Sequence, residues 1–112
     1  VDIVLGDNHG TSCAPEVTSL AEQVLIDTGF NVVRNRPYAG GYITRCYGQP
    51  EIGQHSLQVE INRSLYMNER TIQRGPELPG LTRRMGRLIK ALTEIKLEIL
   101  KPKSETIPKA AE

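Results

Sequence analysis

PYAGGYITRCYGQPEIGQHSLQVEINRSLYMNE, residues 37–69, is the most informative stretch of the chain. Within it, residues 55–62 alternate apolar and polar side chains with a period of two, which predicts a strand with one face on a helical layer. Its apolar face carries Leu57, Val59 and Ile61, and its polar face carries Ser56, Gln58, Glu60 and Asn62. Glu60 is notable because an acid in a strand suited to a sheet interior needs a reason to be there. Such a polar face either meets solvent or lines a cleft.

The N-terminal part predicts a strand, a helix and a second strand. Residues 1–6 form a short apolar run that ends in glycine, which suits a buried parallel strand. A helix is expected to begin at Pro15 and to end at Gly29. Its apolar stripe consists of Val17, Leu20, Ala21, Val24 and Leu25. With a strand at residues 30–34, this pattern favours a βαβ unit and therefore an α/β fold with a parallel strand pair.

A polar turn with two candidate metal ligands, Asp7 and His9, follows the first strand. The carboxyl end of a strand is where open α/β sheets bind ligands. One histidine and one aspartate without a third ligand are a weak zinc signal, however. We favour the interpretation that Asp7, Thr11 and Ser12 bond backbone amides near the next helix.

Residues 35–54 contain too many glycines and prolines for a long regular element. Gly40 and Gly41 allow a tight turn or a close approach of the backbone to a ligand. Arg45 could hold a carboxylate through two parallel hydrogen bonds. Alternatively, it could pair with a structural acid such as Glu51.

The C-terminal part predicts a polar surface connection at residues 68–79 and one long amphipathic helix after it. The apolar stripe of this helix is Leu81, Met85, Leu88, Leu92, Ile95 and Ile99, and its other face carries Arg83, Arg84, Arg87, Lys90 and Lys96. Docking of the stripe on the sheet is favoured over a short coiled coil, and a solvated basic face over a nucleic-acid contact. Residues 101–112 are expected to form a flexible tail.

Composition gives a general frame for these elements. The 112 residues are 38% hydrophobic, which allows one small folded domain. A net charge of +1 gives no general attraction to nucleic acid, and no apolar run is long enough for a membrane span. Cys13 and Cys46 are expected to be reduced, partly buried thiols of a cytoplasmic protein. Because Val1 already lies in a strand pattern, the chain is expected to be a fragment or an incomplete sequence.

Two stretches resemble one enzyme family. GGYITRCYGQPEIGQHSLQVEINRSLYMNE (residues 40–69) is similar to the C-terminal half of the N-formylglutamate amidohydrolases, and DIVLGDNHGTSCAPE (residues 2–16) to their middle region. These zinc enzymes are related to carboxypeptidases and aspartoacylases. The resemblance implies a three-layer α/β/α fold with a mostly parallel or mixed sheet, here as an incomplete portion. Residues 1–100 would be the C-terminal part of one hydrolase domain.

The resemblance also implies roles for individual residues. Glu60, in Gln-Val-Glu-Ile, matches the position of the general acid/base that accepts a proton from water and later delivers it. The expected substrate contacts are Arg45 first and Arg63 second, with Tyr42, Thr44 and Asn62 as neutral hydrogen-bonding groups. His55 is expected either to contact residues that bind the substrate, without touching the substrate itself, or to be a structural hydrogen-bonding histidine.

The implied reaction is hydrolysis of N-formyl-L-glutamate to formate and L-glutamate, the last step of one route of histidine degradation. Zinc is implied for the complete protein, but the family's zinc-ligand motifs lie upstream of the matched region. We therefore expect no metal ligand, no catalytic zinc and no deformylase activity in this chain alone. The alternatives are a non-catalytic module that binds a small dicarboxylate, or an inactive fragment. Other N-acylated amino acids or peptides could be substrates, and copies of the chain could pair at an exposed sheet edge.

Overall fold

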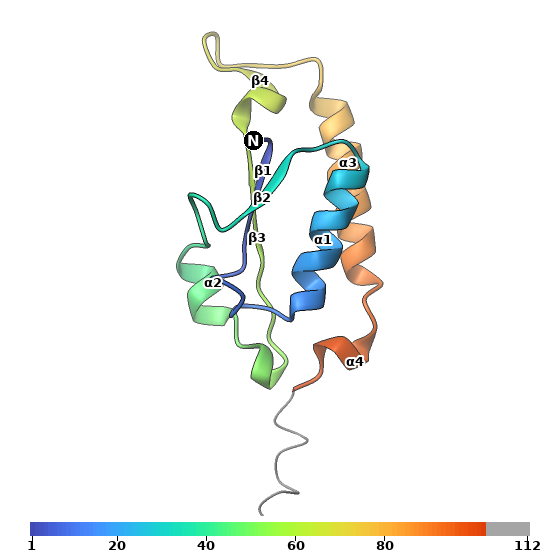
Figure 1. Ribbon diagram of the computed structural model, residues 1–112. Helices are drawn as coiled ribbons and strands as arrows, with labels where there is room; N and C mark the ends of the chain where they lie inside the picture. The colour runs from blue at the N-terminus through green and yellow to red at the C-terminus, as the bar shows by residue number, and fades with distance from the viewer. Residues whose placement is uncertain (103–112) are drawn as a thin grey trace, which may run out of the picture.

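The computed structural model describes residues 1–102, and a mixed three-stranded sheet in the order β2-β1-β3 lies at its centre (Figure 1). β1 (Ile3–Gly6) runs parallel to β2 (Val32–Arg34) and antiparallel to β3 (Gln58–Ile61). The predicted α/β class and the predicted parallel pair are thus confirmed. All three strands are shorter than the sequence pattern predicts, because their outer residues lie outside the hydrogen-bonded ladders of the sheet. For example, Asn62 caps the 3₁₀ turn η2 (Arg63–Leu65) instead of extending β3.

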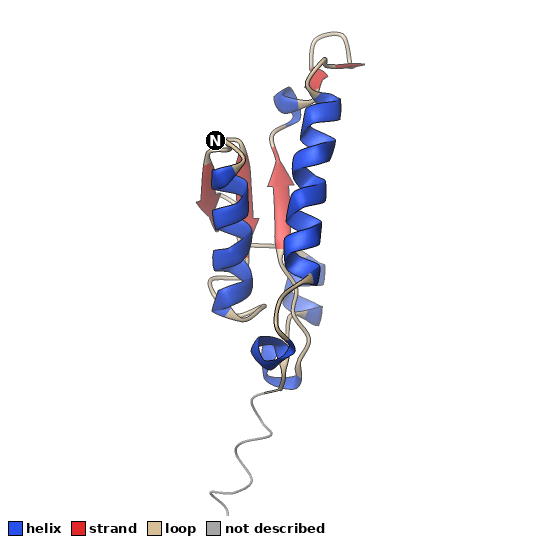
Figure 2. Ribbon diagram, turned by 90° about the vertical axis from the view of Figure 1, so that its right-hand side faces the viewer, coloured by secondary structure: helices blue, strands red, loops and turns tan. Residues whose placement is uncertain are grey.

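Two long helices cover one face of the sheet. α1 (Pro15–Asp27) and α3 (Leu78–Thr93) lie side by side against it (Figure 2). The core that they enclose consists of Ile3, Leu5, Ala21, Leu25, Phe30, Leu81 and Leu88. Leu57, Val59 and Ile61 pack against this core, as the period of two predicts. The coiled-coil alternative is therefore unnecessary, since the apolar stripe of α3 docks on the sheet and on α1.

The boundaries of α1 follow the sequence signals. Pro15 occupies the first turn, where its missing N–H has no cost, and Gly29 follows the helix with a left-handed φ of 101°. The N–H of Gly29 donates to the carbonyl oxygen of Ile26. Glycine adopts this conformation without a steric penalty, so it lets the chain reverse into β2.

The prediction of one long helix over residues 81–99 is wrong in two respects. α3 begins earlier, at Leu78, because Pro79 fits its first turn. It also ends at Thr93, and a separate short helix, α4 (Leu97–Leu100), follows. The break lets the chain bend so that its last apolar side chains, Ile95, Ile99 and Leu100, pack against the cluster of Cys13, Ala14 and Val17.

Short elements occupy the connections. α2 (Tyr42–Tyr47) lies on the other side of the sheet from α1 and α3, and the 3₁₀ turn η1 (Pro50–Ile52) follows it (Figure 1). The predicted surface connection contains a small antiparallel pair, β4 (Met67–Asn68) and β5 (Gln73–Arg74). Residues 1–102 thus contain one layer of long helices, and the second layer of the α/β/α arrangement stays a prediction.

Two predictions concern the ends and the surface of the molecule. The flexible tail was expected at residues 101–112, of which 103–112 lie outside the described residues. Within residues 1–102, no helix has the length and hydrophobicity that a membrane crossing requires. The basic face of α3 is not wholly solvated, because the Arg84 guanidinium lies 4.3 Å from the centroid of the Phe30 ring.

Candidate functional site

Glu60 faces away from the helical layer and lines an open pocket. In the register of the sheet it lies opposite Val4, whereas the flanking Ile3 and Leu5 point into the core. The pocket has a volume of about 420 Å³. Its polar and charged lining residues are Asp2, Arg36, Tyr38, Glu60, Asn62, Arg63 and Glu69. We refer to this cavity as the Glu60 pocket; it is large enough for a small polar ligand.

Four charged side chains of the Glu60 pocket are free to meet a ligand. Among the described residues, Glu60, Glu69, Arg36 and Arg63 make no side-chain hydrogen bond or ion pair. Asp2 is engaged, because its Oδ2 accepts a hydrogen bond of 2.8 Å from the backbone N–H of Asn31. The pocket therefore offers one free carboxylate on the sheet and two free guanidinium groups.

Asn62 helps to fix the backbone at the pocket. Its Oδ1 accepts from the backbone N–H of Ser64 at 3.0 Å and from the Ser64 hydroxyl at 2.9 Å. Its Nδ2 donates to the carbonyl oxygen of Val1 at 3.2 Å. Asn62 thus caps η2, the turn that carries Arg63, and ties it to the start of β1.

The predicted substrate contacts on α2 stand apart from the Glu60 pocket. Of the described residues that line the pocket, none comes from α2. Thr44 is buried, whereas Tyr42 and Arg45 are exposed. One guanidinium nitrogen of Arg45 lies 3.4 Å from the carbonyl oxygen of Gly40. Glu60 and Arg63 are therefore brought together in one cavity, and Arg45 is not part of its lining.

Gln58 connects α2 to the strand that carries Glu60. Its Oε1 accepts a hydrogen bond of 2.9 Å from the backbone N–H of Gly41, the residue that precedes α2. Gln58 and Glu60 lie on the same face of β3, two positions apart. This bond sets the position of α2 relative to the Glu60 pocket.

His55 joins two distant segments. Its Nδ1 accepts a hydrogen bond of 3.0 Å from the backbone N–H of Ala14, so the ring proton lies on Nε2 in the neutral form. Nε2 then donates to the carbonyl oxygen of Leu100 at 3.0 Å. Both nitrogens are used in this way, which is the structural alternative considered for this histidine.

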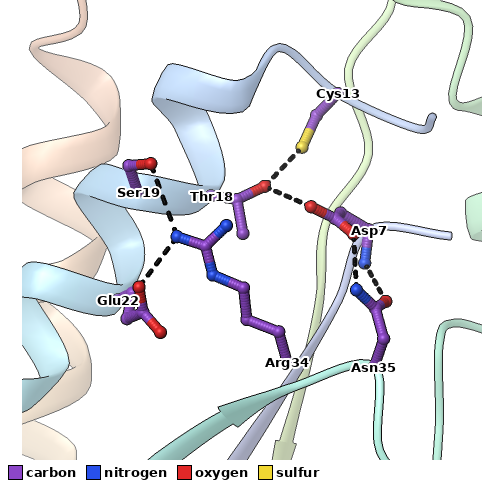
Figure 3. A network of polar contacts seen from close by, with 7 residues as sticks. All are labelled: Asp7, Cys13, Thr18, Ser19, Glu22, Arg34 and Asn35. Atoms are coloured by element: carbon purple, nitrogen blue, oxygen red, sulfur yellow. Dashed lines mark hydrogen bonds and ion pairs between the residues drawn. The ribbon is translucent and has the colours of Figure 1, made fainter. Parts of the chain in front are cut away.

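A buried network surrounds Asp7 (Figure 3). Its Oδ1 accepts from Nδ2 of Asn35 at 2.9 Å and from the backbone N–H of Gly10 at 2.8 Å, and its Oδ2 accepts from the Thr18 hydroxyl at 2.9 Å. Burial by itself would raise the pKa of Asp7, but these hydrogen bonds, led by that from Asn35, hold the pKa below its usual value.

The loop interpretation of the Asp7 region is confirmed for Asp7 and corrected for its neighbours. The hydroxyls of Thr11 and Ser12 donate to the carbonyl oxygens of Asn8 and Ser56, and Thr11 Oγ1 also accepts from the side-chain amide of Asn8. Among the described residues, neither hydroxyl accepts from a backbone amide. Within residues 1–102, no group of three or more histidine, cysteine, aspartate or glutamate side chains could hold a metal ion. These residues alone therefore do not fit a zinc site.

The two cysteines are free thiols, as expected, but they differ in burial. Cys13 is buried and lies 3.2 Å from the Thr18 hydroxyl, whereas Cys46 is exposed. Burial raises the pKa of the Cys13 thiol. Cys13 is therefore protonated at neutral pH and extends the polar network of Asp7 into the core.

Sequence reasoning missed three charged residues of the Glu60 pocket: Asp2, Arg36 and Glu69. A signal for Arg36 was present, because it follows a strand of the parallel pair, at the end where such sheets bind ligands. Pro37, Gly40 and Gly41 follow Arg36, and such residues indicate an irregular backbone without predicting where its side chains lie.

The fold and pocket define an α/β protein with a cavity beside its sheet that an acid and two free arginines line. The family model for N-formylglutamate amidohydrolase matches residues 1–67. The chain therefore belongs to the N-formylglutamate amidohydrolase family, a family of hydrolases.

Individual relatives agree with this assignment. N-formylglutamate deformylases from Pseudomonas aeruginosa and Pseudomonas putida are 42% and 39% identical to the chain over 69 residues, which are 61% of the chain and 26% of each relative. A crystal structure of N-formylglutamate amidohydrolase from Ralstonia eutropha JMP134 matches with a TM-score of 0.74 and 39% identity, over 82% of this chain and 32% of the other. The chain thus spans about a quarter of the length of the curated relatives that it matches.

Proposed function

We propose that this chain forms one part of a zinc-dependent amidohydrolase that cleaves N-formyl-L-glutamate into formate and L-glutamate. The observation that carries the proposal is the position of Glu60, whose unpaired carboxylate lines a cavity together with Arg63. Membership of the N-formylglutamate amidohydrolase family supports the choice of reaction. We also propose that the whole protein acts in the cytoplasm and in histidine degradation.

Glu60 is the acid/base of the proposed reaction. Its carboxylate accepts a proton from the attacking water as the water oxygen bonds to the formyl carbon. The carbon–nitrogen bond then breaks, and Glu60 delivers the proton to the departing nitrogen. A free carboxylate on a rigid strand suits this role, because no internal ion pair has to be broken before it can act.

The substrate's two carboxylates require cationic contacts, and Arg63 is well placed for one of them. It is free of internal partners within the described residues, and Asn62 fixes the turn that carries it. Arg45, Tyr42 and Thr44 remain proposed contacts on the α2 side of the fold. Guanidinium groups suit this purpose because they bind a carboxylate through two parallel hydrogen bonds.

Zinc is proposed for the whole protein, with ligands outside the described residues. Such a metal would supply a Lewis acid that could polarise the formyl carbonyl and activate the attacking water. The described residues do not make a metal cage, so the part proposed for this chain is substrate binding and proton transfer.

The second candidate is a non-catalytic module that binds a small dicarboxylate. The free arginines of the Glu60 pocket support it as well, because anion binding needs no metal. The two candidates differ in turnover: an amidohydrolase releases formate, whereas a binding module retains N-formyl-L-glutamate unchanged.

A formate-release assay on the whole protein with added zinc, with N-formyl-L-glutamate as substrate, tests the proposal. We expect equal amounts of formate and L-glutamate. The 112-residue chain alone serves as the matched control, and it is expected to retain no zinc after dialysis and to release no formate. Binding of N-formyl-L-glutamate by the whole protein without release of formate would favour the binding module.

A further inference from the structure

Arg36 and Arg63 line the same cavity from two different segments. Arg36 follows β2 and Arg63 lies in η2, directly after β3, so β1 separates the two strands that lead to them. Both side chains are exposed, and neither has a side-chain partner among the described residues. We propose that Arg36 is the second carboxylate-binding arginine of the Glu60 pocket and that it selects, together with Arg63, for ligands with two carboxylates. This inference rests on the proposed function and names the substrate contact that this function lacked.

The loop that carries Arg36 is fixed at both ends. Before Arg36, the backbone N–H of Asn35 donates to the carbonyl oxygen of Leu5 at 2.8 Å, and the Asn35 side chain donates to buried Asp7 at 2.9 Å. After Arg36, the carbonyl oxygen of Ala39 accepts a hydrogen bond of 2.7 Å from the backbone N–H of Asn8. A loop held in this way presents its side chains at a low entropic cost of binding.

Arg45 is the alternative candidate for binding the second carboxylate, but it is less well placed for a ligand that reaches Glu60. It extends from α2, which contributes no residue to the lining of the pocket within the described part of the chain. Its guanidinium also lies next to the carbonyl oxygen of Gly40. A dicarboxylate bound by Arg36 and Arg63, by contrast, lies in the cavity that Glu60 lines.

The acids of the pocket set a limit on its affinity for anions. Asp2 is bonded to the backbone N–H of Asn31, and Glu60 carries the proposed chemistry. Glu69 remains as an exposed acid at the edge of the pocket, where its charge opposes a dicarboxylate. Removal of that charge should therefore strengthen binding, whereas removal of Arg36 should weaken it.

The test is an NMR titration of the 112-residue chain with glutarate, a five-carbon dicarboxylate, and with butyrate as the monocarboxylate comparison. We expect wild type to prefer glutarate and Arg36→Ala to weaken glutarate binding by about tenfold with little effect on butyrate. Arg36→Lys should recover only a small part, because an ammonium group does not form the paired bonds of a guanidinium. Glu69→Gln should tighten glutarate binding.

Arg87→Ala, which removes an exposed arginine of α3, is the matched control and should leave both ligands unaffected. The proposal is overturned if wild type binds glutarate no better than butyrate, or if Arg36→Ala binds glutarate as wild type does. The amide spectrum of each variant shows that it is folded. Failure of the proposed function gives a different result. In that case the whole protein releases no formate, but its preference for glutarate still depends on Arg36. This result would leave the role of Arg36 and Arg63 in dicarboxylate binding unchanged and would favour a binding module.

Discussion

Asp7 and Glu60 are both acids of one small sheet, and their surroundings give them different roles. Asp7 is 4% exposed and accepts hydrogen bonds from Asn35, Gly10 and Thr18, so it serves the fold. Glu60 has no such partners among the described residues and lines an open cavity, so it is available to a ligand. The residue type alone does not separate these roles, because the difference lies in burial and in the donors that surround each carboxylate.

Asp7→Asn should destabilise the fold by about 2 kcal/mol at pH 7, because an amide nitrogen would face the hydrogen-bond donors that now bond to the carboxylate. The folded pKa of Asp7 is lowered from 3.8, so its stabilising effect is complete above that pH and is lost as the pH falls through the lowered value. Urea unfolding at pH 7 and at pH 3 should therefore show a smaller difference between wild type and variant at the lower pH.

Asp27→Asn is the control for this measurement. Asp27 is exposed at the end of α1 and bonds only to the side chain of Gln23 among the described residues. Its substitution should change stability by less than about 0.5 kcal/mol. If the Asp7→Asn protein were as stable as the Asp27→Asn protein at pH 7, the hydrogen bonds of Asp7 would not stabilise the fold.

A regular pattern in the sequence predicts the position of Glu60, whereas Arg63 is predicted only through the family resemblance. Glu60 could be assigned to the polar face of its strand because the alternation from Leu57 to Ile61 is strict. Arg36 could not be placed, because it lies in a loop whose course depends on bonds between Asn35, Ala39 and the end of β1. Such contacts link residues that are far apart in the sequence, and no local pattern specifies them.

At the scale of elements, the residues that flank α2 pack closely against the end of β1 and against the loop that follows β1. A Cβ on Gly6 would lie 2.7 Å from the carbonyl carbon of Ala39. A Cβ on Gly48, which follows α2, would lie 2.4 Å from the Cβ of Ser12. Gly6 and Gly48 therefore allow segments of the chain to approach each other more closely than a side chain would permit.

Gly48→Ala should lower the free energy of unfolding by about 2 kcal/mol, because the new methyl group overlaps Ser12 and the carbonyl oxygen of Thr44. Gly86→Ala is the matched control within α3, where the added Cβ meets no atom within 4 Å. It should raise stability by up to about 1 kcal/mol through helix propensity. Thermal unfolding of both variants checks the pair, and equal effects of the two substitutions would contradict the close packing of α2.

Element types were predictable, but several boundaries were not. The apolar periodicity of α3 continues through Ile95 and Ile99, so the sequence favours a single helix. In the structure the chain bends after Thr93 so that those same side chains reach the cluster around Cys13. Tertiary packing decides such a break, and a helical repeat in the sequence does not record it.

At the scale of the whole molecule, long helices cover one face of the sheet (Figure 1). Glu60, on the other face, lines the Glu60 pocket. Several large apolar side chains of the segment between β2 and β3 are exposed, namely Tyr38, Tyr42, Ile43, Tyr47 and Ile52. Only about a quarter of the curated relatives' length is represented in this chain. The family and the parallel strand pair could be predicted from the sequence, because the family motifs and the strand patterns lie within this chain. The second helical layer stays a prediction for the whole protein.

Formate release by the whole protein, wild type compared with Glu60→Gln, is the most direct test of the central claim that Glu60 moves the protons of amide hydrolysis. We predict that the variant binds N-formyl-L-glutamate and zinc normally but turns over at least about a hundredfold more slowly. Glu94→Gln, which removes an exposed acid after α3, should have the kcat of wild type. A Glu60→Gln protein with nearly wild-type turnover would contradict the account.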